Sequence, residues 1–82
     1  MDYVILSNGE YRYKIYYNKY DKVSTLLTQL KKYYQTKSNN GIVLIYGTTA
    51  LDENKRIMDY NITSGKRIKF SDAYDGGLNN EI

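Results

Sequence analysis

The hydrophobic residues at the start of the chain alternate with their neighbours, with the two-residue period of a β-strand. In residues 1–6 this alternation predicts an inner face that carries Tyr3 and Ile5. The opposite, outer face of the same strand then carries Val4 and Leu6. We therefore expect the chain to begin with a strand.

A second strand is expected at residues 11–17, where Tyr13, Ile15 and Tyr17 share one face. An Asn-Gly pair lies between the two predicted strands, and this pair is the strongest short-range signal of a β-hairpin. The first two elements are therefore expected to pair as a hairpin.

The period then changes to that of a helix, over residues 21–35. Asp21 is the expected N-cap, because its carboxylate can accept hydrogen bonds from the free backbone N–H groups of the first turn. The apolar residues fall at helical spacing and form one stripe, which consists of Val23, Leu26, Leu27, Leu30 and Tyr34. Lysines gather at the far end, where they suit the helix dipole, namely Lys31, Lys32 and Lys37.

Two more strands are expected after the helix, at residues 42–46 and 66–71. In the first of them, Val43 and Ile45 are expected to face outward. The second alternates in the same way, with Ile68 and Phe70 inward and Lys69 and Ser71 outward. The order is thus hairpin, helix, strand, irregular crossover and strand.

One helix has to cover one face of a mixed sheet, because every apolar face needs a partner. The pattern therefore predicts an α+β protein of β-grasp architecture, with a mixed sheet of four to five strands and one helix across one face. The predicted core consists of Tyr3, Ile5, Ile15, Val23, Leu26, Leu30, Leu44, Leu51, Ile57, Ile62, Ile68 and Phe70.

The composition excludes several kinds of chemistry. A chain of 82 residues is expected to form one domain, and it contains neither cysteine nor histidine. Disulfides, zinc sites of the usual kinds and classical catalytic triads are therefore excluded. The N-terminus lacks the features of a signal peptide, and no apolar segment is long enough to span a bilayer. We expect a cytoplasmic protein that does not bind a membrane.

The charges are mixed, with twelve basic and nine acidic residues and a net charge of +3. Because the basic residues are scattered, the sequence gives little support to nucleic-acid binding. Eleven tyrosines suit strands and contact surfaces. A composition rich in tyrosine, asparagine, lysine and isoleucine also fits an AT-rich genome, so both explanations stay open.

Residues 44–62, LIYGTTALDENKRIMDYNI, resemble the matching stretch of ubiquitin, including the run from Asp59 to Ile62. The first hairpin and the helix align with ubiquitin without a gap, and one extra residue precedes the third strand. Counting on from Ile62, the paired glycines at the end of ubiquitin fall on Gly76 and Gly77. The chain is therefore identified as a divergent relative of the ubiquitin-like modifiers. A bacterial conjugation operon is one setting for such a sequence.

The resemblance implies how the chain works. In this family an activating enzyme uses ATP to adenylate the terminal glycine carboxylate. It then passes the protein to a conjugating enzyme, which forms an amide with a lysine of the target protein. The modifier itself catalyses nothing and needs no cofactor. Glycine suits such a tail, because it has no Cβ to collide with a narrow enzyme channel.

The resemblance also divides the chain into three parts. Residues 1–72 are expected to form the ubiquitin-like β-grasp domain, and residues 73–77 a flexible conjugation tail. Residues 78–82 follow the glycines, as in precursors that a dedicated peptidase cuts. The predicted cleavage site is the bond between Gly77 and Leu78.

The residues before the glycines depart from the family. Ala73 and Asp75 stand where ubiquitin carries arginines, and Tyr74 replaces a leucine. An acid in place of a base should reduce recognition by the activating enzyme of ubiquitin. These residues therefore imply a dedicated set of enzymes that reads the tail.

Ubiquitin also has a recognition patch, and Ile45 matches its central isoleucine. Its flanking apolar positions fall on Asn8 or Gly9 and on Ser71, and Lys69 stands where a histidine would be. A contiguous apolar outer face is expected to bind a partner or a second copy of the chain. The candidate interaction surface consists of Ile45, Val43, Val4, Leu6, Lys69 and Ser71. The alternative is that Ile45 is a singly exposed apolar residue, which is common.

Two other functions remain open. A β-grasp sulfur carrier also ends in two glycines and is adenylated, but it becomes a thiocarboxylate. A non-conjugated interaction or assembly subunit would leave the glycines without a chemical role.

Overall fold

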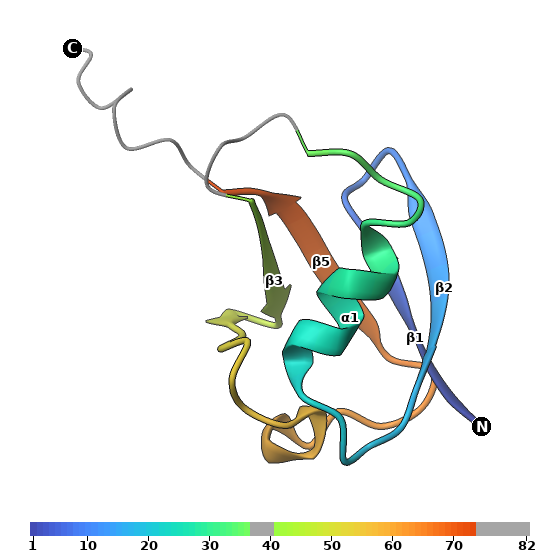
Figure 1. Ribbon diagram of the computed structural model, residues 1–82, viewed down its shortest axis with the longest axis vertical. Helices are drawn as coiled ribbons and strands as arrows, with labels where there is room; N and C mark the ends of the chain where they lie inside the picture. The colour runs from blue at the N-terminus through green and yellow to red at the C-terminus, as the bar shows by residue number, and fades with distance from the viewer. Residues whose placement is uncertain (37–40, 74–82) are drawn as a thin grey trace, which may run out of the picture.

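Within the residues that the structure describes, the chain forms one mixed sheet of five strands, with one α-helix across one of its faces (Figure 1). The computed structural model describes residues 1–36 and 41–73. The elements in chain order are β1 (Asp2–Ser7), β2 (Arg12–Tyr17), α1 (Val23–Leu30), β3 (Ile42–Tyr46), β4 (Thr49–Ala50), the 3-10 helix η1 (Ile57–Tyr60) and β5 (Arg67–Asp72).

The order of the strands across the sheet is β2-β1-β5-β3-β4. β1 and β2 form the predicted antiparallel hairpin, while β1 and β5 pair in parallel at the centre of the sheet. β3 is antiparallel to both β5 and β4. This topology, with α1 across one face, confirms the predicted α+β architecture of β-grasp type.

The core lies between α1 and the sheet. It contains the residues that were expected from the helical stripe and from β2, β3 and β5, together with the anchors Leu51, Ile57 and Ile62. No polar or charged residue of the described part of the chain is fully buried. Within the same part, no helix is long and apolar enough to cross a membrane.

The predicted orientation of the first strand is wrong. Val4 and Leu6 are fully buried, whereas Tyr3 and Ile5 are partly exposed on the opposite face. Val4 lies opposite the buried Ile15 in the hairpin, and residues directly opposite each other share a face. The face of β1 that was predicted to be outer is therefore its inner face, and an error of one residue in register turns every side chain of a strand to the other face.

The predicted N-cap of the helix is also wrong. α1 begins at Val23, and its N-cap residue Lys22 makes no side-chain capping bond. The first two N–H groups, those of Val23 and Ser24, donate instead to backbone carbonyls of the loop at residues 53–55, at 2.8 and 3.1 Å. The Asp21 carboxylate accepts a hydrogen bond from the backbone of Asn18 at 3.2 Å, so it stabilises the preceding turn.

The helix ends at Leu30, five residues before the predicted end at residue 35. The N–H groups of Lys32 and Tyr33 donate to carbonyls three residues back, which tightens the chain into a turn. Lys31 is the C-cap residue, and Lys37 lies outside the described residues. Tyr34 still packs against the core from this turn.

Candidate functional site

The face of the sheet opposite α1 is the most extensive surface that the strands present. Because residues opposite one another in the register share a face, its members follow from the strand pairing. We call it the outer sheet face, and it consists of Tyr3, Ile5, Ser7, Arg12, Lys14, Tyr16, Val43, Ile45, Ala50, Arg67, Lys69 and Ser71.

Four of the six residues of the predicted interaction surface lie on this face. Ile45 is directly opposite Lys69, and Val43 is directly opposite Ser71, across the β3–β5 pair. Both apolar side chains are partly exposed, and Lys69 and Ser71 are exposed. The structure therefore brings these four residues together.

Val4 and Leu6 do not belong to this surface. Both are completely buried beneath α1, on the inner face of β1. Ile5 takes their place, since it is partly exposed and lies opposite Arg67 on the outer face. The hydrophobic residues that β1 contributes to this face are therefore Tyr3 and Ile5 instead of Val4 and Leu6.

A hollow of about 540 Å³ opens beside Ile45. Its lining includes Asn8, Gly9 and Lys69. These are positions that the sequence alignment matched to residues next to the central isoleucine of ubiquitin's recognition patch. The turn between β1 and β2 and the strands β3 and β5 all contribute to it. Ile45 is thus a partly exposed apolar residue in a depression with polar and cationic surroundings.

The charged residues of the outer sheet face are all cationic. Among its strand positions, each of which the structure describes, the charged residues are Arg12, Lys14, Arg67 and Lys69. The Lys14 ammonium lies 4.4 Å from the centre of the Tyr3 ring and 5.3 Å from that of Tyr16. A surface of one sign attracts partners of the opposite sign.

Sequence reasoning missed this concentration of charge, because the basic residues look scattered along the chain. This concentration could have been predicted from the sequence, because the basic residues occupy alternate positions in two of the strands. Arg12 and Lys14 alternate with inward residues of β2, and Arg67 and Lys69 alternate with Ile68 and Phe70 of β5.

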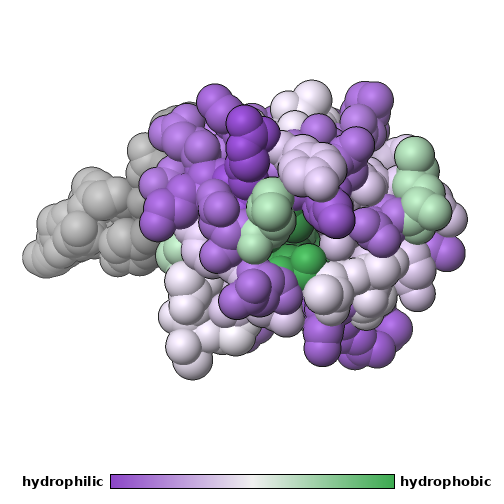
Figure 2. Space-filling model, turned by 90° about the horizontal axis from the view of Figure 1, so that it is seen from below, coloured by the Kyte–Doolittle hydropathy of each residue, from purple (hydrophilic) through white to green (hydrophobic). Residues whose placement is uncertain are grey.

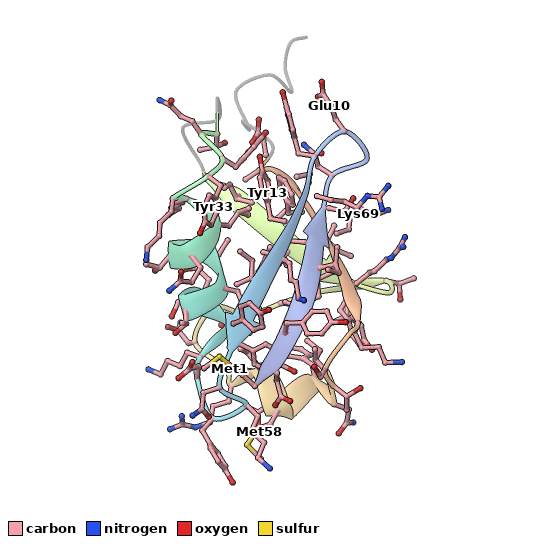
Figure 3. All side chains as sticks on the ribbon, turned by 90° about the vertical axis from the view of Figure 1, so that its right-hand side faces the viewer. Met1, Glu10, Tyr13, Tyr33, Met58 and Lys69 are labelled. Atoms are coloured by element: carbon pink, nitrogen blue, oxygen red, sulfur yellow. The ribbon has the colours of Figure 1, made fainter. Side chains whose placement is uncertain are left out.

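Figure 2 shows the molecule from below Figure 1, at the end where the N-terminus lies. This end is mostly hydrophilic, and hydrophobic colour covers only small areas of it. Met58, which lies at this end in Figure 3, is 43% exposed, and single exposed apolar residues are common on folded surfaces.

The predicted conjugation tail starts from a fixed point. The N–H group of Ala73 donates to the carbonyl of Gly41 at 2.7 Å, one residue past the end of β5. Asp72 accepts hydrogen bonds from the hydroxyls of Tyr34 and Thr36, at 3.1 and 2.6 Å. The remaining predicted tail residues lie outside the described residues, and they are Tyr74, Asp75, Gly76 and Gly77; Leu78, on the far side of the predicted cleavage site, lies outside them as well.

In the ranges 1–36 and 41–73, no three acidic, histidine or cysteine side chains gather as a metal site would need. Burial raises the pKa of Tyr17 above 10.0, and the nearby Asp2 charge adds to the effect. Its hydroxyl donates to the carbonyl of Ile62 at 3.4 Å, so the phenol has a structural role.

Comparison with known proteins identifies the fold. No protein-family model matches the chain, and no curated protein does. Among solved structures, 131 chains match, so the fold is a widespread one that does not by itself assign a function. One match is the solution NMR structure of the ubiquitin-like domain of an Arabidopsis thaliana protein. The two share 20% identity and a TM-score of 0.75, over 90% of this chain and 84% of that one.

The fold is therefore a ubiquitin-like β-grasp, as the resemblance in residues 44–62 implied. At 20% identity the likeness concerns the fold.

Proposed function

We propose that this chain is a ubiquitin-like protein modifier that is conjugated through the carboxylate of Gly77. The observation that carries the proposal is the position of the Gly-Gly pair relative to a ubiquitin-like domain. Strand β5 ends at Asp72, and Gly76 and Gly77 follow it by four and five residues.

The distance along the chain suits conjugation. Five residues span at most about 17 Å when fully extended, which is long enough to carry a carboxylate away from the sheet. Because glycine lacks a Cβ, such a segment can pass through a channel too narrow for other residues. The first residue of the tail is held by the hydrogen bond from the Ala73 N–H group to the Gly41 carbonyl, so the tail leaves the domain at a defined position.

In this proposal a peptidase hydrolyses the Gly77–Leu78 bond, and water supplies the new carboxylate oxygen. An activating enzyme then adenylates the carboxylate with ATP and releases pyrophosphate, and a cysteine thiolate attacks the acyl adenylate to form a thioester and release AMP. A lysine amine of the target finally displaces the thiol. Ala73, Tyr74 and Asp75 lie next to the reacting end, where the enzymes would read them. We place this pathway in the cytoplasm.

The test begins with the intact mass of the protein recovered from its native cell, which should correspond to residues 1–77. Peptides from target proteins should carry Gly77 on a lysine. Gly76→Ala should fold normally but resist cleavage and thioester formation, because the added Cβ obstructs the channel. Asn79→Ala is the matched control, since it changes a residue beyond the cleavage site and should leave conjugation unaffected.

A chain that keeps residues 78–82 in the cell and forms no conjugates would contradict the proposal. Normal conjugation of Gly76→Ala would contradict it as well.

A second candidate is a non-conjugated interaction or assembly subunit, which the outer sheet face favours. Its partly exposed Ile45 lies opposite Lys69 and lines a hollow to which Arg67 also contributes, and these cations suit an acidic protein partner. The two candidates differ in their need for the glycines. A chain that ends at Asp75 should retain the biological role of an interaction subunit and lose that of a modifier.

A further inference from the structure

A second hollow, of about 520 Å³, lies on the helix side of the sheet, where the turn between β1 and β2 meets the segment after α1. In Figure 1 that segment passes beside the turn, and Figure 3 shows Tyr13 and Tyr33 close together near the end that carries Glu10. We call it the tyrosine hollow and define it by Tyr11, Tyr13, Tyr33 and Tyr34 with the acids Glu10 and Asp72.

The tyrosine rings form a connected series. Tyr13 is at the centre, with its ring centre 5.8 Å from that of Tyr33 and 6.3 Å from that of Tyr11. The ring planes differ by only 18° and 17° in these two pairs. Tyr34 makes a tilted contact with Tyr11 at 6.2 Å. The stacked rings therefore form an aromatic platform built from two separate segments of the chain.

Burial explains only half of this platform. Tyr13 and Tyr34 contact the fully buried Phe70, with ring centres 6.1 and 4.9 Å apart, so they belong to the edge of the core. Tyr33 and Tyr11 are 63% and 47% exposed. Tyrosines held in place with exposed rings are typical of contact surfaces, since their binding costs little side-chain entropy.

The charged residues that line the hollow are both acidic. Asp72 is held by hydrogen bonds from the hydroxyls of Tyr34 and Thr36, and Glu10 is exposed at the turn. The backbone of Glu10 donates to the Asn8 side chain at 2.9 Å, which fixes the turn. The whole chain carries +3, so this hollow differs in sign from the rest of the molecule.

We propose that the tyrosine hollow binds an arginine side chain presented by a partner protein. A guanidinium is planar, so it stacks on an exposed tyrosine ring and at the same time donates hydrogen bonds to a carboxylate. An ammonium is compact and more strongly hydrated, which makes lysine a weaker ligand here. Nucleic acid also stacks on tyrosines, but the exposed Glu10 carboxylate at the hollow repels its phosphates.

This site is independent of the proposed conjugation, because none of its residues belongs to the tail after Ala73. It is also distinct from the outer sheet face, since Tyr13 shares the inner face of β2 with Ile15. Whether the chain is a modifier or an assembly subunit, it would have two contact surfaces: the cationic outer sheet face and the acidic tyrosine hollow.

The experiment titrates the full chain, observed by NMR, with a short glycine-flanked arginine peptide. The matched peptides carry lysine or citrulline in place of arginine, and citrulline keeps the shape of arginine without its charge. We expect the arginine peptide to shift the backbone signals of Glu10, Tyr11 and Tyr33 and to bind more tightly than the lysine peptide. The citrulline peptide should cause little change.

Variants then assign the binding to the hollow. Tyr33→Leu keeps an apolar side chain but removes the ring, and it should weaken binding about two- to fivefold. Tyr20→Leu, at an exposed tyrosine outside the hollow, is its control. Glu10→Gln should also weaken binding, whereas Glu53→Gln removes the same charge elsewhere on the surface and should have no effect.

Several results would overturn the proposal. Equal binding of the citrulline and arginine peptides would exclude recognition of the cation. Equal effects of Glu10→Gln and Glu53→Gln would show general charge attraction. A short single-stranded RNA that binds the hollow more tightly than the arginine peptide, and loses affinity in Tyr33→Leu, would assign the site to nucleic acid.

Discussion

The phenol oxygen of Tyr60 accepts a hydrogen bond from the backbone N–H of Asp52, at a distance of 2.8 Å. This contact ties η1 to the loop after β4, eight residues earlier in the chain. Asp59 caps η1 by accepting from the backbone of Arg56 at 2.9 Å, and Asn61 ends it in the left-handed conformation with φ 57°. In the run that resembles ubiquitin, Asp59, Tyr60 and Asn61 therefore each have a structural role.

Tyr60→Phe removes the acceptor of this hydrogen bond and leaves the ring in place. We expect it to lower the free energy of unfolding by about 0.5–1.5 kcal/mol, the usual contribution of one hydrogen bond. The matched control is Tyr20→Phe, at an exposed tyrosine, which should change stability by less than about 0.5 kcal/mol. Urea unfolding of the three proteins makes the comparison. Equal effects of the two substitutions would contradict a structural role for the Tyr60 hydroxyl.

The local sequence pattern predicts that β1 is a strand, but the pairing with β2 and β5 decides which of its faces is buried. Leu6 and Ile5 are both apolar, so alternation predicts a strand but does not choose its inner face. The choice is made by pairing, since Leu6 lies opposite Ile68 of β5 and Tyr13 of β2. These contacts join residues far apart in the sequence, and therefore no local pattern contains them.

This register gives a second prediction. Leu6→Ala should destabilise the protein by about 2–5 kcal/mol, because it leaves a cavity in a fully buried position. Ile5→Ala removes a similar volume from the partly exposed outer face and should cost about 1 kcal/mol. Denaturant unfolding of both variants measures the difference. A larger cost for Ile5→Ala would show that Tyr3 and Ile5 face the core, as we first expected from the sequence.

The two surfaces differ in how far sequence could have revealed them. Lys69 was placed on the outer face because it alternates with Ile68 and Phe70 in β5, whereas Ile45, in the wholly apolar strand 42–46, was placed there with the help of the resemblance to ubiquitin. The tyrosine hollow was not foreseen, since the chain leaves the helix at Leu30 instead of continuing to residue 35. This early end turns Tyr33 and Tyr34 toward the start of β2, where their rings meet Tyr11 and Tyr13.

The hydrogen bond from Tyr34 to Asp72 leads to a pH-dependent prediction. Burial raises the pKa of Tyr34 above 10.0, and so do the hydrogen bond to Asp72 and its negative charge. The folded protein thus holds this proton more tightly than the unfolded chain. The resulting stabilisation is complete below about pH 10 and is lost as the pH rises through the raised pKa.

Tyr34→Phe removes both the hydrogen bond and the ionisation. We expect the variant to be less stable than the wild type at pH 7, and the difference to shrink above about pH 10. Unfolding measured at a series of pH values tests this, with Tyr20→Phe as the control that should follow the wild type throughout. A difference that grows with rising pH would contradict the assigned role of the Tyr34 proton.

The cations of the outer sheet face determine how two copies of the chain can meet. If two outer faces packed together through Ile45, the side chains Lys14, Arg67 and Lys69 would approach the same cations of the second copy. Salt screens such repulsion, with a Debye length of about 10 Å at 0.1 M and about 3 Å at 1 M. Sedimentation at low salt should therefore give a monomer, and any dimer should increase with salt.

Two substitutions test whether such a dimer uses the outer face. Ile45→Asp should abolish it, since a charged residue would replace the apolar centre of the contact. Lys69→Glu should promote association at low salt, because an acid on each copy would attract the remaining cations of the other. Lys55→Glu, outside this face, is the control for the change in net charge. A dimer that strengthens at low salt, or one that Ile45→Asp leaves intact, would have to form through a different surface. The outer face would then remain available to an acidic partner, whose binding should weaken as salt is added.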